Sequence, residues 1–286
     1  MVKKILSQVY IYLILLLMYL PILVLIAYSF SVNTSIGDGY KFGTTLWVNL
    51  FTDTKIAREI WTALGNTVII AVISAVISVV LGTLGAIGAF YSKRRAQKAI
   101  EITTQIPVSN AEIVIALSLV VMFVFIGDRI FHANLFSFWT LLIGHVVLSL
   151  PFVYLSVKPK LIQMDPHLYE AALDLGATPR QGLVKVIIPE IMPGILSGFL
   201  LSITLSLDDF IVTAFTRGAG LLSGEKTIET LSTLIQAKLK KGPIPAEMRP
   251  MTLIIFALVL LVAIGATFYK NAQAKKIKVR RGRANV

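Results

Sequence analysis

Residues 165–193 read DPHLYEAALDLGATPRQGLVKVIIPEIMP, a polar stretch that lies between two long apolar runs. Asp165 can accept a hydrogen bond from the free N–H groups at the start of a helix, and Pro166 already has the φ angle of a first helical residue. Apolar residues follow at spacings of three and four, which predicts one apolar helix face. The residues of this face are Leu168, Ala171, Ala172 and Leu175. The stretch therefore begins with a short amphipathic helix.

A glycine turn and a second helix should follow the first. Gly176 lacks a Cβ, so it can adopt the left-handed conformation that commonly closes a helix. Thr178 and Gln181 form the pattern of a capping box around a proline at the first helical position, which predicts a second helix start. Pro189 and Pro193 should end that helix, because proline lacks the backbone N–H that a helix uses. The stretch thus predicts helix, turn, helix and then a membrane span.

The composition predicts an all-α, polytopic membrane protein. Of the 286 residues, 56% are hydrophobic, and the mean hydropathy is +0.80. A helix needs about 20 apolar residues to cross a bilayer, and six runs are long enough. We expect a single membrane domain over residues 1–286. Its six predicted spans are Val9–Phe30, Asn66–Tyr91, Ile106–Gly127, Phe136–Val157, Gly194–Thr216 and Met251–Tyr269.

The basic residues indicate how these spans are oriented. With the N-terminus inside, the inner segments hold 17 of the 27 Lys and Arg residues, which satisfies the positive-inside rule. We therefore expect both termini in the cytoplasm, a cytoplasmic loop at 159–193 and an outer loop at 217–249. The basic tail Lys275–Arg283 should contact anionic membrane lipids rather than nucleic acid, because no aromatic residues are interleaved with its charges. Membrane topology thus accounts for the net charge of +12.

Acidic residues inside the predicted spans indicate what crosses the membrane. Ionisable side chains are costly there, so they mark functional sites by default. Glu112 lies near the start of the third span, and Asp208 and Asp209 interrupt the fifth. Since these spans contain no Lys or Arg, the pathway should be negative and the cargo a cation. His145 in the fourth span is interpreted as a packed, hydrogen-bonded residue between helices and is not assigned to the site.

Alternatives stay open for these carboxylates. Adjacent helical residues point about 100° apart, so only one of Asp208 and Asp209 should face the pathway, and we favour Asp208. The pair would instead be structural if it caps a broken helix. Glu112 would extend to the outer surface if the third span begins later than predicted.

Seven residues of the polar stretch follow a known spacing: Glu170, Ala171, Ala172, Gly176, Val186, Ile188 and Pro189. This spacing resembles the EAA loop of ABC type I importer permeases, with Val and Ile replacing the usual Ile and Leu. Both replacements keep apolar bulk. The resemblance extends over nearly the whole chain and implies a six-helix permease whose loop 159–193 docks on a cytoplasmic ATPase. The coupling residues it implies are Glu170, Ala171, Ala172 and Gly176.

The same resemblance implies the partners. In such importers a homologous permease subunit completes the pathway, two ATPase subunits bind ATP and Mg²⁺, and an extracytoplasmic substrate-binding protein delivers the cargo. This chain would then bind no cofactor or metal, catalyse no reaction and lie in a bacterial inner membrane. Its residues agree, because it contains no cysteine, no Walker-type glycine loop and no recognisable serine nucleophile motif.

The S-L-D-D motif at 206–209 and the acidic Glu112 extend the resemblance to the spermidine/putrescine permeases, although we would expect Asp rather than Glu in the third span. Tyr19 and Trp47 also match aromatic positions of that family. Polyamines are flexible cations, which suits carboxylates for their ammonium groups and aromatic faces for cation–π contact. Both aromatic residues would instead belong to the membrane-interface belts if they do not meet the cargo.

Other cargoes and another class of protein are the alternatives. Another small cationic solute, or ferric iron, would also suit a pathway lined by carboxylates. A passive cation channel would need the same acidic residues, but it leaves the capped hairpin unexplained. The hairpin therefore favours an importer.

Overall fold

The computed structural model describes residues 2–33, 39–52, 54–218, 228–241, 246, 248–261 and 264–265. These residues fall into two compact units, each with its own packing. Unit 1 contains Met1–Thr62 and Leu234–Leu261, and unit 2 is built on Ala63–Thr233. The basic tail lies outside the described residues. The single domain over 1–286 and the two loop boundaries stay predictions.

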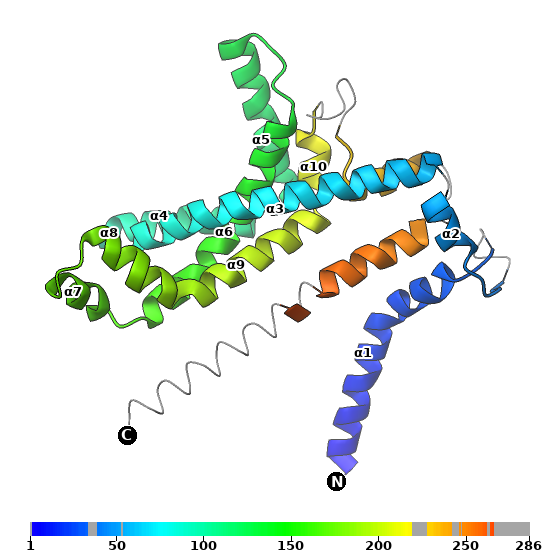
Figure 1. The fold of residues 1–286 in the computed structure, drawn as a ribbon, viewed down its shortest axis with the longest axis horizontal. Helices are drawn as coiled ribbons and strands as arrows, with labels where there is room; N and C mark the ends of the chain where they lie inside the picture. The colour runs from blue at the N-terminus through cyan, green and yellow to red at the C-terminus, as the bar shows by residue number, and fades with distance from the viewer. Residues whose placement is uncertain are drawn as a thin grey trace. The chain divides into compact units, whose positions relative to one another are not determined.

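The described residues are helical apart from turns, loops and an isolated antiparallel bridge between Ser31 and Phe42. Five helices are long and apolar enough to cross a membrane, and a shorter apolar helix covers Met248–Leu261. The expected all-α fold is confirmed (Figure 1). The named helices are α1 (Val2–Ser29), α2 (Thr45–Thr52), α3 (Thr54–Phe90), α4 (Arg94–Ser109), α5 (Glu112–Ile126), α6 (Phe138–Gln163), α7 (His167–Asp174), α8 (Pro179–Gly182), α9 (Ile188–Asp208), α10 (Ile211–Thr216) and α11 (Leu231–Lys241).

Unit 1 is held together by aromatic and ionic contacts. The Phe30 ring stacks on Trp47 of α2, with ring centroids 5.5 Å apart. Lys238 Nζ of α11 lies 2.7 Å from Glu59 Oε2 at the start of α3. The long helix α1 adds little to this core, because none of its most apolar stretch is buried within the chain. Such a helix needs lipid or another protein around it.

Unit 2 is built around α6, the most buried of the five spans. Helix α9 runs antiparallel to it, since Gly194 meets Val157 and Gly198 meets Val153. A Cβ added at Gly198 would lie 3.1 Å from Val153 Cα, and one added at Gly82 of α3 would lie 2.8 Å from the Val153 side chain. Small residues therefore allow three helices to approach closely around Val153.

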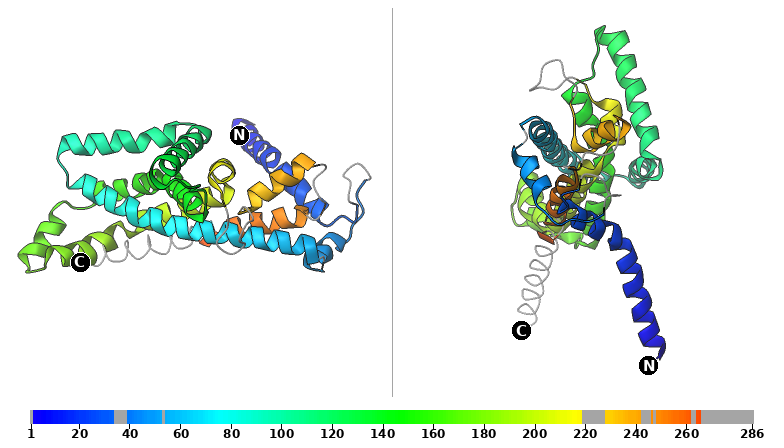
Figure 2. Two further views of the ribbon diagram at one scale, coloured as in Figure 1. Left: turned by 90° about the horizontal axis from the view of Figure 1, so that it is seen from above. Right: turned by 90° about the vertical axis from the view of Figure 1, so that its right-hand side faces the viewer.

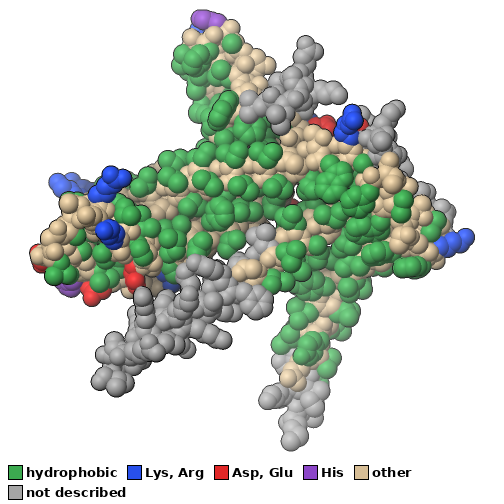
Figure 3. Space-filling view, in the orientation of Figure 1, with side chains coloured by type: hydrophobic (Ala, Val, Ile, Leu, Met, Phe, Trp, Pro, Cys, Tyr) green, Lys and Arg blue, Asp and Glu red, His purple; other side chains and the backbone are tan. Residues whose placement is uncertain are grey.

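The surface of unit 2 separates apolar from charged side chains. Hydrophobic side chains cover the flank over α3, whereas several Lys, Arg, Asp and Glu side chains lie at the end that carries α4, α7 and α8 (Figure 3). Exposed apolar residues recur along one side of α3: Val72, Val76, Val80 and Leu84. An apolar flank with a charged end is the pattern of a membrane protein that meets water at that end.

The third span begins later than predicted. We expected Ile106–Gly127, but α4 ends at Ser109 and α5 begins at Glu112. Residues 110–111 between them have extended backbone, and the two helices run in different directions (Figures 1 and 2). Pro107 lies in the last turn of α4 and marks the approaching end of that helix. Apolar composition alone could not reveal the turn.

Pro189 and Pro193 do not end the second helix of the hairpin, so that prediction was wrong. From Pro179 the chain continues through a π-helical turn, Leu183–Ile187, into α9 and stays helical to Asp208. Pro189 is the second residue of α9 and lies in its first turn, where a missing N–H is tolerated. The second helix of the hairpin and the fifth span are therefore one continuous helix.

The remaining boundaries differ in smaller ways. The fifth span ends at Asp208 rather than Thr216, because the chain leaves the helix at residues 209–210 before α10 begins. The fourth span continues to Gln163, beyond the predicted Val157, with Pro159 inside the helix. The first span agrees with the prediction, whereas the second span starts well before its predicted boundary. The predicted end of the sixth span lies outside the described residues.

Candidate functional site

The helical hairpin begins and turns as its sequence predicts. Asp165 Oδ1 accepts a hydrogen bond from the N–H of His167 (3.0 Å), where α7 starts. After α7, Gly176 has a φ of +86°, the left-handed conformation that favours glycine. The N–H of Ala177 donates to the carbonyl of Ala172 (3.0 Å), which closes the helix end.

The second helix begins with the predicted capping box. Thr178 Oγ1 accepts a hydrogen bond from the N–H of Gln181 (3.3 Å), and the N–H of Thr178 donates to Gln181 Oε1 (2.9 Å). Pro179 takes the first helical position between them. The start signals of both helices are therefore confirmed.

The apolar face of α7 differs from the prediction. Ala171 is exposed and Leu175 keeps 90% of its surface exposed. Tyr169 and Leu173 instead pack inward against Gly182 at the start of the second helix. The helix is amphipathic as expected, but the large Tyr169 ring buries more apolar surface than a small alanine does and so decides which face turns inward.

The outward side of α7 is small, acidic and partly apolar. We call it the hairpin tip and define it as Glu170, Ala171, Asp174 and Leu175, all of which are exposed. Glu170 Oε2 also lies 3.4 Å from His167 Nδ1. Alanine side chains let a partner's backbone approach closely, and the exposed leucine offers apolar surface. The four residues thus form a surface on which another protein can dock.

Aromatic contacts connect the hairpin to the spans of unit 2. The Tyr169 ring lies 5.6 Å from that of Tyr91, which follows α3. Burial, and then the neighbouring Tyr169 phenol, raise the pKa of Tyr91 above its ordinary value. Leu168 and Leu183 pack on the core that α3, α6 and α9 share. The hairpin is therefore anchored on these spans.

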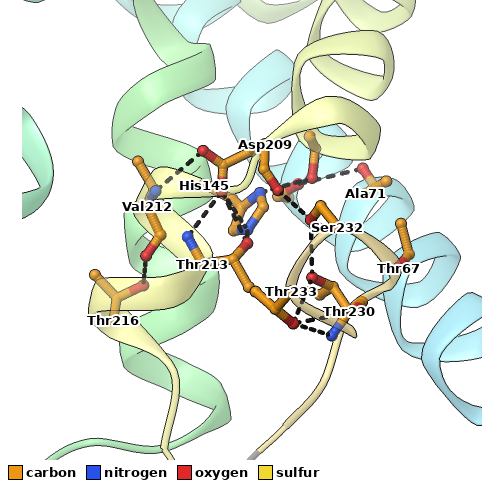
Figure 4. Close-up of polar contacts among 12 residues, drawn as sticks. Thr67, Ala71, His145, Asp209, Val212, Thr213, Thr216, Thr230, Ser232 and Thr233 are labelled. Atoms are coloured by element: carbon orange, nitrogen blue, oxygen red, sulfur yellow. Dashed lines mark hydrogen bonds and ion pairs between the residues drawn. The ribbon is translucent and has the colours of Figure 1, made fainter. Parts of the chain in front are cut away.

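A second group of polar residues lies where α9 and α10 meet. Asp209, only 6% exposed, caps α10: its carboxylate accepts the N–H of Val212 (3.1 Å) and both the N–H and the hydroxyl of Thr213 (2.8 Å each), as Figure 4 shows. Its backbone carbonyl accepts the hydroxyl of Ser232 (2.7 Å). This is the broken, capped helix that the sequence left open as an alternative.

Asp208, the last residue of α9, is exposed, and so is Glu112, the first residue of α5. Because the third span begins at Glu112, the condition for the alternative in which this residue extends to the surface is met, and its place in the pathway stays a prediction. One turn further along α5, Ala116 packs against Leu148 of α6 and Val212 of α10. This packing places the first turn of α5, which begins with Glu112, beside α10 and next to the pair Asp208 and Asp209. The structure thus brings together the three acidic residues that the sequence singled out.

His145 of α6 lies beside this acidic group and is 1% exposed. Its Nδ1 lies 2.7 Å from Ser206 Oγ, and its Nε2 lies 2.9 Å from Thr213 Oγ1 and 3.7 Å from Asp209 Oδ2. The interpretation of His145 as a packed, hydrogen-bonded residue between helices is confirmed.

The two aromatic candidates belong to the other unit. Tyr19 of α1 is 54% exposed, and Trp47 of α2 is half-buried with Phe30 stacked on its ring. Both lie in unit 1, whereas the acidic group lies in unit 2. A cargo contact by either residue therefore stays a prediction.

Sequence reasoning missed the contacts that hydroxyl residues make around the acidic group, although Ser206 belongs to the S-L-D-D motif. Thr213 lies four residues after Asp209, a spacing that suits a side-chain contact across one helical turn. Ser206 precedes the Asp pair, but its contact with His145 joins two separate helices. Ser232 comes from the predicted outer loop and could not have been found from spacing.

Residues 78–278 match the protein family described as binding-protein-dependent transport system inner membrane component. The chain belongs to this family. The permease is 30% identical over 246 residues to the spermidine/putrescine transport system permease protein PotC of Escherichia coli (strain K12), covering 86% of this chain and 87% of that protein. It is also 30% identical over 219 residues to the putrescine transport system permease protein PotI of the same organism, covering 76% of this chain and 75% of PotI.

Solved structures share the fold of the permease. A chain of a bacterial ABC transporter that imports the acidic polysaccharide alginate superposes with a TM-score of 0.69 at 17% identity, covering 94% of this chain and 98% of that one. A chain of the MetNI methionine ABC transporter superposes with a TM-score of 0.54 at 19% identity, covering 76% and 94% of the two chains. These structures confirm the ABC importer permease fold.

Family membership decides the general role of the permease. It is a multi-pass inner-membrane subunit of a bacterial ABC transporter, and it works with ATPase and binding-protein partners. ATP hydrolysis takes place on the separate ATPase, which binds the nucleotide, so the permease itself is not an enzyme. A passive channel is thereby set aside.

Proposed function

We propose that this permease forms half of the translocation pathway of a polyamine importer, with Asp208 and Glu112 binding the ammonium groups of spermidine or putrescine. The observation that carries the proposal is that Asp208 and Glu112 are exposed at the ends of two different helices, which the packing of Ala116 on Val212 brings near each other beside buried Asp209. Carboxylates form short, charge-assisted hydrogen bonds with ammonium groups. Similarity to PotC and PotI supports the same cargo class.

The fold alone would not favour this cargo. A chain with a similar fold belongs to a transporter of an acidic polysaccharide. Charge complementarity therefore carries the argument, because an anionic cargo would be repelled by the acidic group. We retain Tyr19 and Trp47 as candidate cation–π contacts to the cargo.

We also propose that the hairpin docks on the ATPase through Glu170 and Ala171 of the tip, with Ala172 and Gly176 setting its shape. The helix from Pro179 to Asp208 offers a mechanical connection, since 30 helical residues extend roughly 45 Å. A displacement of the hairpin would move this helix and, with it, the acidic residue at its far end. The anchoring of Tyr169 on the core supports transmission of the movement to α3 and α6 as well.

The proposed orientation follows the charge distribution. Both termini and the loop 159–193 would lie in the cytoplasm, and the outer loop 217–249 would meet the extracytoplasmic binding protein. The charged end of unit 2, which carries the hairpin, supports contact of that end with water. The full transporter would contain a homologous permease subunit and two ATPase subunits that bind ATP and Mg²⁺.

Uptake of radiolabelled spermidine and putrescine by vesicles that hold the full transporter tests the cargo. We expect Asp208→Asn to reduce uptake about tenfold or more while the subunits still assemble, because an amide replaces the charge that pairs with an ammonium group. Asp128→Asn, at an exposed acidic residue beyond the far end of α5, serves as the matched control and should transport normally.

Two results would contradict the polyamine assignment. One is wild-type uptake by Asp208→Asn. The other is a wild-type transporter that moves neither polyamine, which would favour another small cationic solute or ferric iron. Competition by unlabelled cations of each kind in the same vesicles would identify which of them is carried.

A further inference from the structure

The break between α9 and α10 is held by a hydrogen-bond network centred on His145 (Figure 4). His145 contacts Ser206 of α9 on one side of the break and Thr213 of α10 on the other. Ser206 Oγ also lies 3.3 Å from Ser74 Oγ of α3. His145 is buried, and the network around it thus connects α3, α6, α9 and α10 next to Asp209.

Each hydrogen bond of this network has a defined donor and acceptor. Thr213 donates its single hydroxyl proton to Asp209 Oδ2 at 2.8 Å. Thr213 Oγ1 must therefore accept from His145, which places the ring proton on Nε2. The bare Nδ1 of a neutral ring then accepts the hydroxyl of Ser206.

The network fixes the backbone at the place where the proposed cargo residue sits. Asp209 is extended, with a ψ of 126°, and its side chain and carbonyl are both hydrogen-bonded. Asp208 precedes it directly, so the orientation of the exposed carboxylate depends on how Asp209 is held. Ser232 holds the carbonyl of Asp209, and Thr213 holds its side chain. His145 contacts Thr213 and so acts on Asp209 through it.

We propose that His145 is a positioning residue for cargo selection: through Thr213 it fixes Asp209 and thereby the direction in which Asp208 meets the cation. The proposal rests on the proposed function, because it needs Asp208 to bind the cargo. Sites that bind ligands selectively depend on such supporting hydrogen bonds to hold the contacting groups in place. A histidine that only fills space would have no effect on which cargo is preferred.

Two substitutions at His145 separate its two contacts. The amide nitrogen of Gln reaches the position of Nε2, so His145→Gln keeps the donation to Thr213. The shorter Asn reaches only the position of Nδ1, so His145→Asn keeps the contact with Ser206 and loses the one with Thr213. Thr213→Val removes the hydroxyl without changing the shape of the side chain, and Thr213→Ser restores it.

The readout is the ratio of spermidine to putrescine uptake by the full transporter, measured with saturating loaded binding protein. Putrescine has two charged groups and spermidine three, so spermidine can shift to another ammonium group when one carboxylate is misdirected. We expect the ratio to rise about threefold to tenfold in His145→Asn and Thr213→Val, the effect of one lost hydrogen bond. His145→Gln and Thr213→Ser should bring it back toward the wild-type value.

Thr216→Val is the matched control. Thr216 is buried on the same helix, but its hydroxyl donates to the carbonyl of Val212 and has no contact with Asp209 in the described part of the chain. The same substitution there should leave the ratio unchanged. A change equal to that of Thr213→Val would mean that packing is responsible and would overturn the proposal.

Other outcomes also decide the question. An unchanged or falling ratio in Thr213→Val, or equal ratios in Thr213→Val and Thr213→Ser, overturns the role of the network even where His145→Asn fails to assemble. If Asp208→Asn abolishes uptake while the His145 and Thr213 variants keep the wild-type ratio, the proposed function stands and the positioning role falls. If the wild-type transporter moves neither polyamine, both fall.

Discussion

Asp208 and Asp209 are adjacent in sequence but lie in opposite environments. Asp209 is buried and accepts three hydrogen bonds at the start of α10, whereas Asp208 is exposed at the end of α9. A capped carboxylate has little capacity left for a cargo ammonium group. The structural alternative considered from the sequence therefore describes Asp209, and Asp208 remains the proposed cargo residue.

This division of roles predicts that substituting Asp209 lowers stability and that substituting Asp208 does not. Asp209→Ala should lower the free energy of unfolding by about 2 kcal/mol, because the first N–H groups of α10 lose their buried acceptor. Asp208→Ala is the control and should leave the unfolding temperature almost unchanged. Thermal unfolding of the purified transporter in detergent measures both. Equal unfolding temperatures of the two variants would contradict the capping role of Asp209.

At the scale of elements, the second helix of the hairpin and the fifth span form one long helix, Pro179–Asp208. The sequence predicted two separate elements divided by prolines, but the π-helical turn at Leu183–Ile187 lets the helix continue into α9. Proline inside a helix is tolerated where neighbouring structure adapts to the missing hydrogen bond. The turn at Gly176 then sets the angle between α7 and this long helix.

Replacing this glycine tests the turn. No atom of the described residues lies within 4 Å of a Cβ added at Gly176, so the cost of Gly176→Ala comes from its φ of +86° and should be about 1–2 kcal/mol. We expect weaker association with the ATPase subunits, measured by co-purification. Gly85→Ala in α3 also meets nothing within 4 Å but lies in ordinary helix, so it should leave assembly intact.

At the scale of the whole molecule, the same permease fold serves cargoes of different chemistry. Transporters of an acidic polysaccharide and of methionine contain chains of similar fold at 17% and 19% identity. What these chains share is the helical framework, so the cargo must depend on side chains that line the pathway. The separate ATPase supplies the energy for transport through ATP hydrolysis.

If the hairpin tip couples the permease to the ATPase, a charge reversal there should disrupt transport. Glu170→Arg should leave the permease in the membrane but uncouple transport from ATP hydrolysis, because the reversed charge repels the groups that the carboxylate would meet on the ATPase. Polyamine uptake and ATPase activity in the same vesicles measure the effect. We expect uptake to fall about tenfold or more, while basal ATP hydrolysis continues.

Glu190→Arg provides the control for this variant. Glu190 is another exposed acidic residue, but it lies at the start of α9 and outside the hairpin tip. The coupling assignment predicts normal uptake in Glu190→Arg. Normal uptake in Glu170→Arg would rule out a coupling role for that carboxylate.

The sequence by itself determined the features that depend on neighbouring residues. Apolar runs specified the membrane helices, and the Asp165, Gly176 and Thr178 signals specified the hairpin, because caps and turns act over three or four residues. Paired with the spacing of the EAA motif, these signals were sufficient to indicate an ABC importer permease. They also marked the acidic residues, since a charge in an apolar run is visible without a structure.

Only the tertiary structure decided which of those residues act together. The inward face of α7 depends on Tyr169 meeting a second helix, and the continuity of α9 depends on packing that tolerates Pro189. The contacts of His145 with Ser206 and Thr213 join residues from different helices. Periodicity describes one helix at a time, so partners across helices become visible only when the chain is folded.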